Sequence, residues 1–180
     1  MVYFGQELGE KGMDCEGFSG QDGRTTIFDY WNVDSIYRWS NRGRWNTHLL
    51  SEKEKELRKT YETILHICQK EQAISKGEFF DLMYVNLNGW QMNEHKQYAF
   101  LRKYGQEVLF IMVNFSDTAT QVAVNVPAHA FEYFKMTPSA QCNAKDLLTG
   151  KTEKIYFTPE SPTCTELPAY GGKIFKLKVK

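Results

Sequence analysis

The sequence lacks an excess of charge of either sign, a long apolar run and a signal peptide. Its 22 Lys and Arg balance its 22 Asp and Glu, so the net charge gives no reason to expect nucleic acid or a membrane as partner. The longest apolar run, Val108–Val113, is far shorter than the roughly 20 residues that span a bilayer. The N-terminus has no basic segment followed by an apolar one, so no signal peptide is predicted.

The sequence also lacks the spacings of a metal site. None of the four cysteines belongs to a C-x-x-C pair, and none has a histidine at ligand spacing. The four histidines fall in different predicted elements, and none is assigned a catalytic role. We therefore predict isolated thiols and expect neither a metal nor a cofactor. The cysteines are Cys15, Cys68, Cys142 and Cys164.

Common catalytic motifs are missing as well. Gly17-Phe18-Ser19-Gly20 is one residue short of a G-x-S-x-G nucleophile elbow, and there is no G-x-G-x-x-G or P-loop. Two carboxyl groups about 5 Å or more apart would suit glycoside hydrolysis, and the acidic residues before Trp31 could supply them. Loop carboxylates more commonly bond loop amides, and this alternative stays open. No catalytic residue is assigned.

The segment Tyr3–Trp31 is rich in glycine, which is sparse in the rest of the chain. Six glycines recur every three to five residues, which excludes a regular helix and favours a long loop. Its aromatic residues argue against disorder. Met1–Phe4 is apolar and reads as the end of a buried strand. Asp34 is predicted to cap a short helical turn that carries Ile36, Tyr37 and Trp39.

A long amphipathic helix is predicted over Ser51–Ala73, with Gly77 as its stop. Ser51-Glu52-Lys53-Glu54 has the S-x-x-E form of a capping box. The apolar residues that follow recur at helical spacing and form one stripe. They are Leu57, Tyr61, Ile64, Leu65 and Cys68.

From Phe79 onward the apolar period changes to two, which is typical of strands. Short strands separated by turn signals, with no helix among them, predict an antiparallel β-sandwich of Greek-key type. Val108–Val113 is apolar throughout, as expected of a central strand. The predicted fold class is therefore α+β, with residues 1–77 and 78–180 as separate regions. The predicted strands are 79–87, 97–103, 107–114, 121–126, 144–148, 151–157 and 173–179.

The same residues carry a family resemblance. Tyr3-Phe4-Gly5-Gln6-Glu7 resembles the Y-Y-G-x-E signature after the eighth barrel strand of alpha-amylase family glycoside hydrolases. The loop up to Trp31 is similar to the one that follows this strand in a bacterial subgroup. The helix then resembles the last barrel helix, and the strand-rich remainder resembles the C-terminal β domain, with Lys173–Leu177 as its closing strand. The resemblance covers the whole chain in the order of the family.

The resemblance implies the end of a (β/α)8 barrel over 1–77 and a C-terminal β domain over 78–180. A complete barrel takes about 250 residues. In the family, the catalytic carboxylates follow the fourth, fifth and seventh barrel strands, which have no counterpart here. Glu7 therefore matches a structural signature and is not catalytic. The implied parent is a retaining glycosidase that cleaves α-glucans, and this chain alone is expected to be inactive.

Tryptophans are the candidate sugar contacts, because an aromatic face suits the C–H face of a sugar ring. Trp31 and Trp90 are the predicted substrate-binding residues, and Trp39 and Trp45 are further candidates; packing inside the protein is the alternative for each. The expected partner is an α-glucan or maltooligosaccharide. The alternative functions are a non-catalytic carbohydrate-binding domain and a purely structural domain. Exposed apolar surface on the barrel-like segment also predicts mobility, self-association or folding back.

Overall fold

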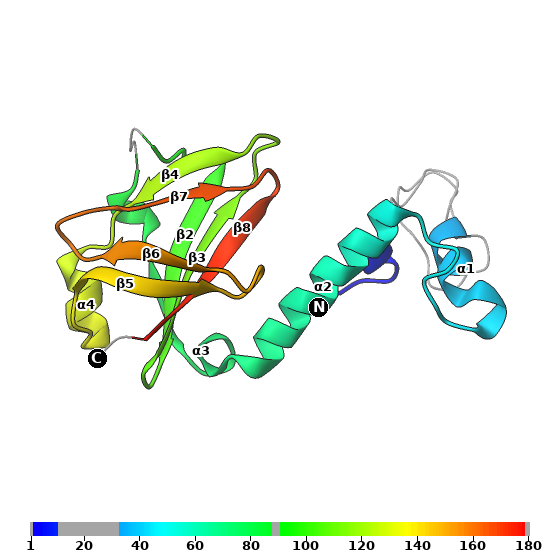
Figure 1. The fold of residues 1–180 in the computed structure, drawn as a ribbon, viewed down its shortest axis with the longest axis horizontal. Helices are drawn as coiled ribbons and strands as arrows, with labels where there is room; N and C mark the ends of the chain where they lie inside the picture. The colour runs from blue at the N-terminus through cyan, green and yellow to red at the C-terminus, as the bar shows by residue number, and fades with distance from the viewer. Residues whose placement is uncertain (1, 11–32, 88–90, 179–180) are drawn as a thin grey trace. The chain divides into compact units, whose positions relative to one another are not determined.

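The structure is a computed structural model that describes residues 2–10, 33–87 and 91–178 (Figure 1). It contains two compact units, Met1–His66 and Ile67–Lys180. Helices dominate the first unit and antiparallel sheets the second, which confirms the predicted α+β class. The helical elements in the described part of the first unit are η1 (Gln6–Leu8), α1 (Asp34–Ser40), η3 (Asn41–Gly43) and most of α2 (Glu52–Lys70).

The capping box predicted for α2 is formed in both directions. The Ser51 amide donates to Glu54 Oε2 at 2.7 Å, and the Glu54 amide donates to Ser51 Oγ at 3.3 Å. The helix ends at Lys70, earlier than predicted, because Glu71 is extended. A separate single turn, α3 (Gln72–Ser75), follows it.

Arg102 of β2 is one of the side chains that fasten the α3 turn to the sheet. Arg102 donates from Nε to the Ala73 carbonyl at 2.9 Å, and from Nη2 to the Ile74 and Gly77 carbonyls at 2.8 and 2.7 Å. These carbonyls lie at the end of the turn, where helical partners are lacking. The guanidinium therefore replaces the next turn of helix.

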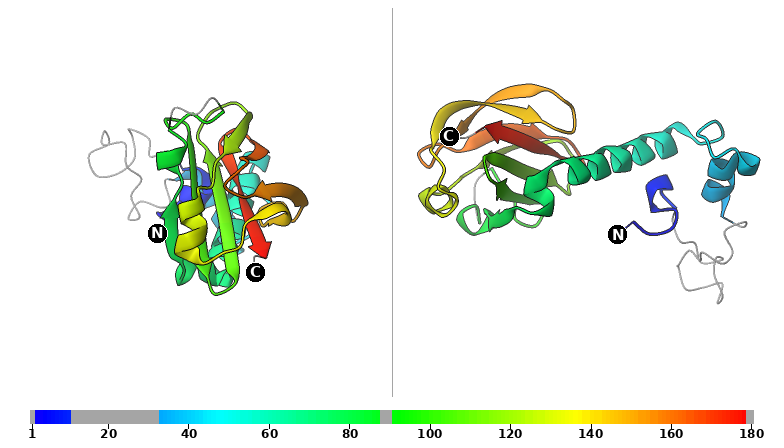
Figure 2. Two further views of the ribbon diagram at one scale, coloured as in Figure 1. Left: turned by 90° about the vertical axis from the view of Figure 1, so that its left-hand side faces the viewer. Right: turned by 90° about the horizontal axis from the view of Figure 1, so that it is seen from below.

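The described residues of the second unit form eight strands in two sheets. One sheet has the order β1-β2-β3-β8-β5-β6, the other pairs β4 with β7, and every pairing is antiparallel. The six-stranded sheet curls, as the ribbon in Figure 2 shows. As a result, Phe110 of β3 lies 6.0 Å from Phe157 of β6 between ring centroids. The strands are β1 (Glu78–Asp81), β2 (Gln97–Tyr104), β3 (Glu107–Asn114), β4 (Thr120–Val124), β5 (Ser139–Asp146), β6 (Thr152–Phe157), β7 (Thr163–Leu167) and β8 (Gly171–Lys178).

The apolar strand β3 is central, as predicted. It pairs with β2 on one side and β8 on the other, and Val108, Leu109 and Phe110 are fully buried. A two-residue turn joins β2 to β3, since Tyr104 pairs with Glu107. Gly105 occupies the positive φ of 57° that such a turn requires.

Three details of the β region differ from the prediction. The helix α4 (Ala128–Phe134) interrupts the strands, where no helix was expected. It follows Pro127 and forms because it can bury Ala130, Phe131 and Phe134 in the core. Strand β7 was not predicted, and the predicted strand 79–87 forms only β1 and the short 3-10 helix η4 (Met83–Val85).

The N-terminal segment also differs from the prediction. Val2 and Tyr3 are exposed and form no strand within the described residues; the chain turns at Phe4 and Gly5 into η1. A strand needs a neighbouring strand to pair its backbone groups, and the described part of the first unit contains none. The predicted glycine-rich loop falls mostly on residues 11–32, outside the described residues.

Candidate functional site

The first unit contains an open pocket of about 920 Å³ between the N-terminal segment, α1 and α2. Its walls are mainly apolar and include five aromatic side chains, with charged side chains among them. The aromatic lining residues are Tyr3, Phe4, Trp39, Trp45 and Tyr61. The charged or titratable ones are Glu7, Arg58, Glu62 and His66.

Trp39 and Trp45 occupy different surroundings. Trp39 is half-buried and packs against the small core of Leu8, Val33, Ile36 and Leu50. The guanidinium of Arg58 lies over its indole, 4.1 Å from the ring centroid. Trp45 is 60% exposed. Trp39 is therefore mainly a packing residue, whereas Trp45 leaves a ring face open to a ligand.

A salt bridge holds α1 against the start of α2. Arg38 Nη2 lies 2.5 Å from Glu54 Oε1, and Arg38 Nε donates to Glu54 Oε2 at 3.3 Å. The hydrogen bond from Arg38 lowers the pKa of the Glu54 carboxyl and outweighs burial, which raises it. The pairing likewise raises the pKa of Arg38. This carboxylate is thus fully engaged in holding the pocket wall together.

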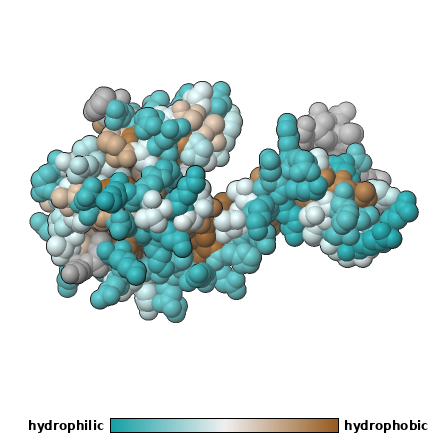
Figure 3. Space-filling model, viewed as in Figure 1, coloured by the Kyte–Doolittle hydropathy of each residue, from teal (hydrophilic) through white to brown (hydrophobic). Residues whose placement is uncertain are grey.

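The apolar stripe of α2 exists as predicted, but the described structure leaves much of it uncovered. Leu65 is 52% exposed and Ile64 is 40% exposed, while Leu57, Tyr61 and Cys68 are half-buried. Figure 3 shows apolar side chains at the surface of the first unit among hydrophilic ones. An amphipathic helix normally buries this face, so the surface is suited to a partner.

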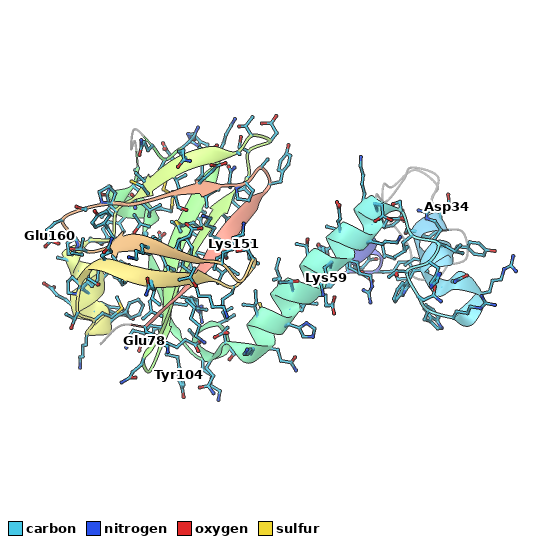
Figure 4. The ribbon with its side chains drawn as sticks, viewed as in Figure 1. Asp34, Lys59, Glu78, Tyr104, Lys151 and Glu160 are labelled. Carbon is cyan, nitrogen blue, oxygen red and sulfur yellow. The ribbon has the colours of Figure 1, made fainter. Side chains whose placement is uncertain are left out.

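The pocket offers surfaces for stacking and hydrogen bonding more than a constellation of reacting groups. Of its two carboxylates, Glu62 is exposed and bonded at 2.9 Å to Lys59, which Figure 4 labels on α2. Within residues 2–10, 33–87 and 91–178, no cluster of three or more His, Cys, Asp or Glu side chains could hold a metal ion. In the same residues, no helix is both long and apolar enough to cross a membrane.

The two predicted substrate-binding residues, Trp31 and Trp90, lie outside the described residues. The pocket instead brings Trp45 together with Tyr3 and Tyr61, which the sequence did not indicate as site residues. Tyr61 belongs to the apolar stripe of the helix, so its position was predictable. The position of the N-terminal segment beside α2 was not predictable, because it depends on contacts between distant parts of the chain.

Comparison with known proteins finds one family that the strand-rich part of the chain resembles. The family model of the alpha amylase C-terminal all-beta domain matches residues 90–177. No curated protein sequence matches the chain.

Several solved structures share the fold. AmyP in complex with maltose has a TM-score of 0.58 and 16% identity, and the match covers 97% of this chain and 30% of AmyP. The alpha-amylase GTA from Geobacillus thermoleovorans, complexed with acarbose, has a TM-score of 0.51 and 14% identity, over 98% of this chain and 29% of GTA. The maltogenic alpha-amylase AmyB from Thermotoga neapolitana has a TM-score of 0.50 and 12% identity, over 72% of this chain and 26% of AmyB.

These identities are low, so the structural likeness shows a shared fold. The chain spans less than a third of the length of each of these enzymes. The sequence match is confined to the strand-rich part of the chain, where it agrees with the two antiparallel sheets. Residues 90–177 are therefore similar to the alpha amylase C-terminal all-beta domain, which relates this part of the chain to alpha-amylase family glycosidases.

Proposed function

We propose that the chain is the C-terminal part of an alpha-amylase-type retaining glycosidase that acts on α-glucans. Residues before Gly77 contribute the last strand, loop and helix of a (β/α)8 barrel, and the remainder is the β domain that follows it. The family match over residues 90–177 supports the second part. The Tyr3–Glu7 signature and the long capped helix, in the family's order, support the first.

The exposed face of α2 is the observation that carries this proposal. A helix of 19 residues with an apolar stripe is stable in water mainly through packing of that stripe. Leu65 and Ile64 are nevertheless 52% and 40% exposed. In a complete barrel, the last helix buries such a face against the strands. In the complete barrel, neighbouring barrel elements would then fill the pocket beside α2.

The charges of the described residues agree with a supporting role. Glu54 is bonded to Arg38 and to the start of α2, and Glu71 and Glu107 are both bonded to Lys176. The Arg38 hydrogen bond lowers the pKa of Glu54, and the Ala73 amide and Lys176 lower the pKa of Glu107 against the effect of burial, so both are poor general acids near neutral pH. The reacting carboxylates of the enzyme therefore come from the preceding part of the barrel, and the chain alone does not hydrolyse glucans.

The claim of inactivity is tested with the purified chain and 4-nitrophenyl maltoheptaoside. We expect no release of nitrophenol above the blank over many hours. Turnover that co-purifies with the chain would contradict the proposal.

The claim of a larger parent is tested independently by sequencing the transcript upstream of the Met1 codon. An in-frame upstream region that encodes barrel strands with three catalytic carboxylates is the expected result. An unrelated gene or an in-frame stop codon immediately upstream would contradict it.

Carbohydrate binding without catalysis is the second candidate, and the open face of Trp45 favours it. A pocket of this size with aromatic walls and a few polar groups has the character of a ligand site. Titration with maltoheptaose, followed by tryptophan fluorescence, tests this function. Loss of the signal in Trp45→Ala, but not in Tyr37→Ala, would support it, because Tyr37 is 55% exposed and does not line the pocket. Absence of any binding would leave a structural role for this surface.

A further inference from the structure

Four aromatic side chains gather on the surface of the second unit. Phe80 of β1 is in the centre, with its ring centroid 6.2 Å from Tyr84, 5.6 Å from His129 and 5.7 Å from Tyr133. Tyr84 comes from η4, and His129 and Tyr133 come from α4. We call these four residues the Phe80 cluster.

The cluster has a buried floor and an open rim. Phe80 is only 9% exposed, whereas Tyr84 is 52% and Tyr133 49% exposed, and His129 is exposed as well. The floor belongs to the main core, which Phe80 enters together with Leu82. The rings of the rim are thus held from below while much of their surface faces water.

The arrangement follows from the two faces of α4. Ala130, Phe131 and Phe134 point into the core and anchor the helix. His129 and Tyr133 are four residues apart, so they share another face of the helix, and both contact Phe80. The helix α4 therefore presents the rings of His129 and Tyr133 at a fixed spacing. Neither ring belongs to the buried residues that anchor the helix in the core.

The polar atoms of the rim are available to a ligand. Within the described residues, neither the Tyr84 hydroxyl, the Tyr133 hydroxyl nor the His129 imidazole makes a hydrogen bond. An apolar ring beside a free hydroxyl or imidazole matches a pyranose, which has a C–H face and a border of hydroxyl groups. Tyrosine and histidine can accept as well as donate, as recognition of sugar hydroxyls requires.

We propose that the Phe80 cluster is a non-catalytic binding site for an α-linked glucan chain. Tyr84 and Tyr133 stack against sugar rings, and the His129 imidazole bonds a hydroxyl at the edge of the site. The choice of an α-glucan as ligand rests on the proposed function, whereas the stacking surface itself does not. All four residues of the site belong to the second unit.

The other exposed tyrosines of the second unit supply a matched control. Tyr156 is 53% exposed and Tyr170 is 76% exposed, comparable to or more open than the rim of the cluster. Neither has a ring contact among the described residues, so neither is part of an aromatic surface. If exposure of a tyrosine were enough for binding, substitution of Tyr156 would weaken glucan binding as much as substitution of Tyr84 or Tyr133. If the Phe80 cluster is the site, only substitutions in the cluster weaken it.

The test is calorimetric titration of the full chain with maltoheptaose in a Trp45→Ala background, which removes the open tryptophan of the first-unit pocket. We expect residual binding, weakened about five- to tenfold by Tyr84→Ala and by Tyr133→Ala. Tyr133→Phe, which keeps the ring, should stay within about threefold, and Tyr156→Ala should leave the affinity unchanged.

Two results would overturn the site: no binding in the Trp45→Ala background, or equal affinity in Tyr84→Ala, Tyr133→Ala and Tyr156→Ala. If Tyr133→Ala unfolds, as thermal melting would reveal, Tyr84→Ala decides alone, because Tyr84 is not part of α4. Failure here leaves the proposed function untouched, since that rests on the hydrolysis assay and the upstream sequence.

Discussion

At the scale of single residues, Glu54 joins two helices of the first unit. Its carboxylate accepts from the Ser51 amide and hydroxyl and from the Arg38 guanidinium. Glu54→Gln keeps the volume and removes the charge, so we expect a loss of about 1–3 kcal/mol from the free energy of unfolding of the first unit. Urea unfolding followed by tryptophan fluorescence measures this loss. Glu56→Gln is the control, because Glu56 is exposed and its carboxylate makes no bond to a described side chain.

The same substitution has a pH signature. The pKa of Glu54 is lowered in the folded chain from its ordinary value of 4.5, chiefly by the Arg38 hydrogen bond against the opposing effect of burial. Its stabilisation is therefore complete above the unfolded pKa and disappears as the pH falls through the lower, folded pKa. The wild-type chain and Glu54→Gln should differ at pH 7 and converge in acid. A difference that grows below pH 4.5 would contradict the assignment.

Gly77 is a residue whose lack of a side chain matters. A Cβ atom there would lie 2.3 Å from the Ala73 carbonyl oxygen and 2.7 Å from the Lys103 carbonyl oxygen. Both are backbone atoms, and the Gly77 carbonyl is itself bonded to Arg102, so the clash is relieved only by moving α3. Gly77→Ala should lower the free energy of unfolding by about 2–3 kcal/mol in a urea titration followed by circular dichroism.

Gly105 provides the comparison for this prediction. It needs a positive φ of 57°, but apart from Gly105 and its two chain neighbours no residue has a heavy atom within 4 Å of the position that a Cβ atom would take. Gly105→Ala should therefore cost only the backbone strain of about 1–2 kcal/mol. A larger loss at Gly105 than at Gly77 would mean that close backbone approach does not limit the α3 junction.

At the scale of elements, a cluster of charges holds the junction between α3 and the sheet. The Ala73 amide donates to Glu107 Oε1 at 2.7 Å, and Lys176 of β8 pairs with both Glu107 and Glu71. Burial alone would lower the pKa of Lys176, but its bonds to Glu71 and Glu107 raise it. Burial raises the pKa of Glu107, but the hydrogen bonds from the Ala73 amide and Lys176 lower it by more, so the net shift is downward. Lys176 and Glu107 are therefore both held in their charged forms.

Removing the shared cation should have a large effect. Lys176→Met leaves Glu71, which is 3% exposed, buried beside Glu107 without a counter-charge, and such losses are about 3–5 kcal/mol. Lys178→Met, on the same strand but exposed, should change stability by less than about 0.5 kcal/mol. Urea unfolding followed by circular dichroism of the sheets measures both. Adding Glu71→Gln to Lys176→Met should recover part of the loss, and no recovery would argue against the charge mechanism.

Elements whose signals are local were predictable from the sequence. The capping box of α2, the continuous apolar run of β3 and the Gly105 turn each depend on neighbours in the chain. Elements that exist through distant contacts were not. In β7, Thr163 and Thr165 face the core, because Thr163 bonds the Tyr156 carbonyl and Thr165 bonds Lys173 and Glu153. A strand with polar residues on its buried face has no clear apolar alternation.

The candidate sites show the same division. The apolar stripe of α2 was predicted, and the tryptophans were named as candidate stacking surfaces for sugar rings. The pocket joins residues 2–5 to residues 58–66, and the Phe80 cluster joins β1 to a helix that was not predicted at all. Such groupings depend on tertiary packing, which sequence periodicity does not report.

At the scale of the whole molecule, the two units differ greatly in their apolar cores. The second unit buries a continuous cluster that spans both of its sheets and α4. The described part of the first unit buries only Leu8, Val33, Ile36 and Leu50, with Phe4 and Trp39 packed against them. A small core offsets little of the conformational entropy lost on folding, so the first unit should be the weaker one.

We therefore expect two unfolding transitions. Three of the four tryptophans belong to the first unit, so fluorescence of a Trp90→Phe chain reports on that unit alone. This signal should change at a urea concentration below the one at which circular dichroism shows loss of the sheets. Amide exchange should agree, with Phe110 protected after the amides of α1 have exchanged. Coincident transitions by both probes would show that the units unfold as one, and that the exposed stripe of α2 is not left without a partner in solution.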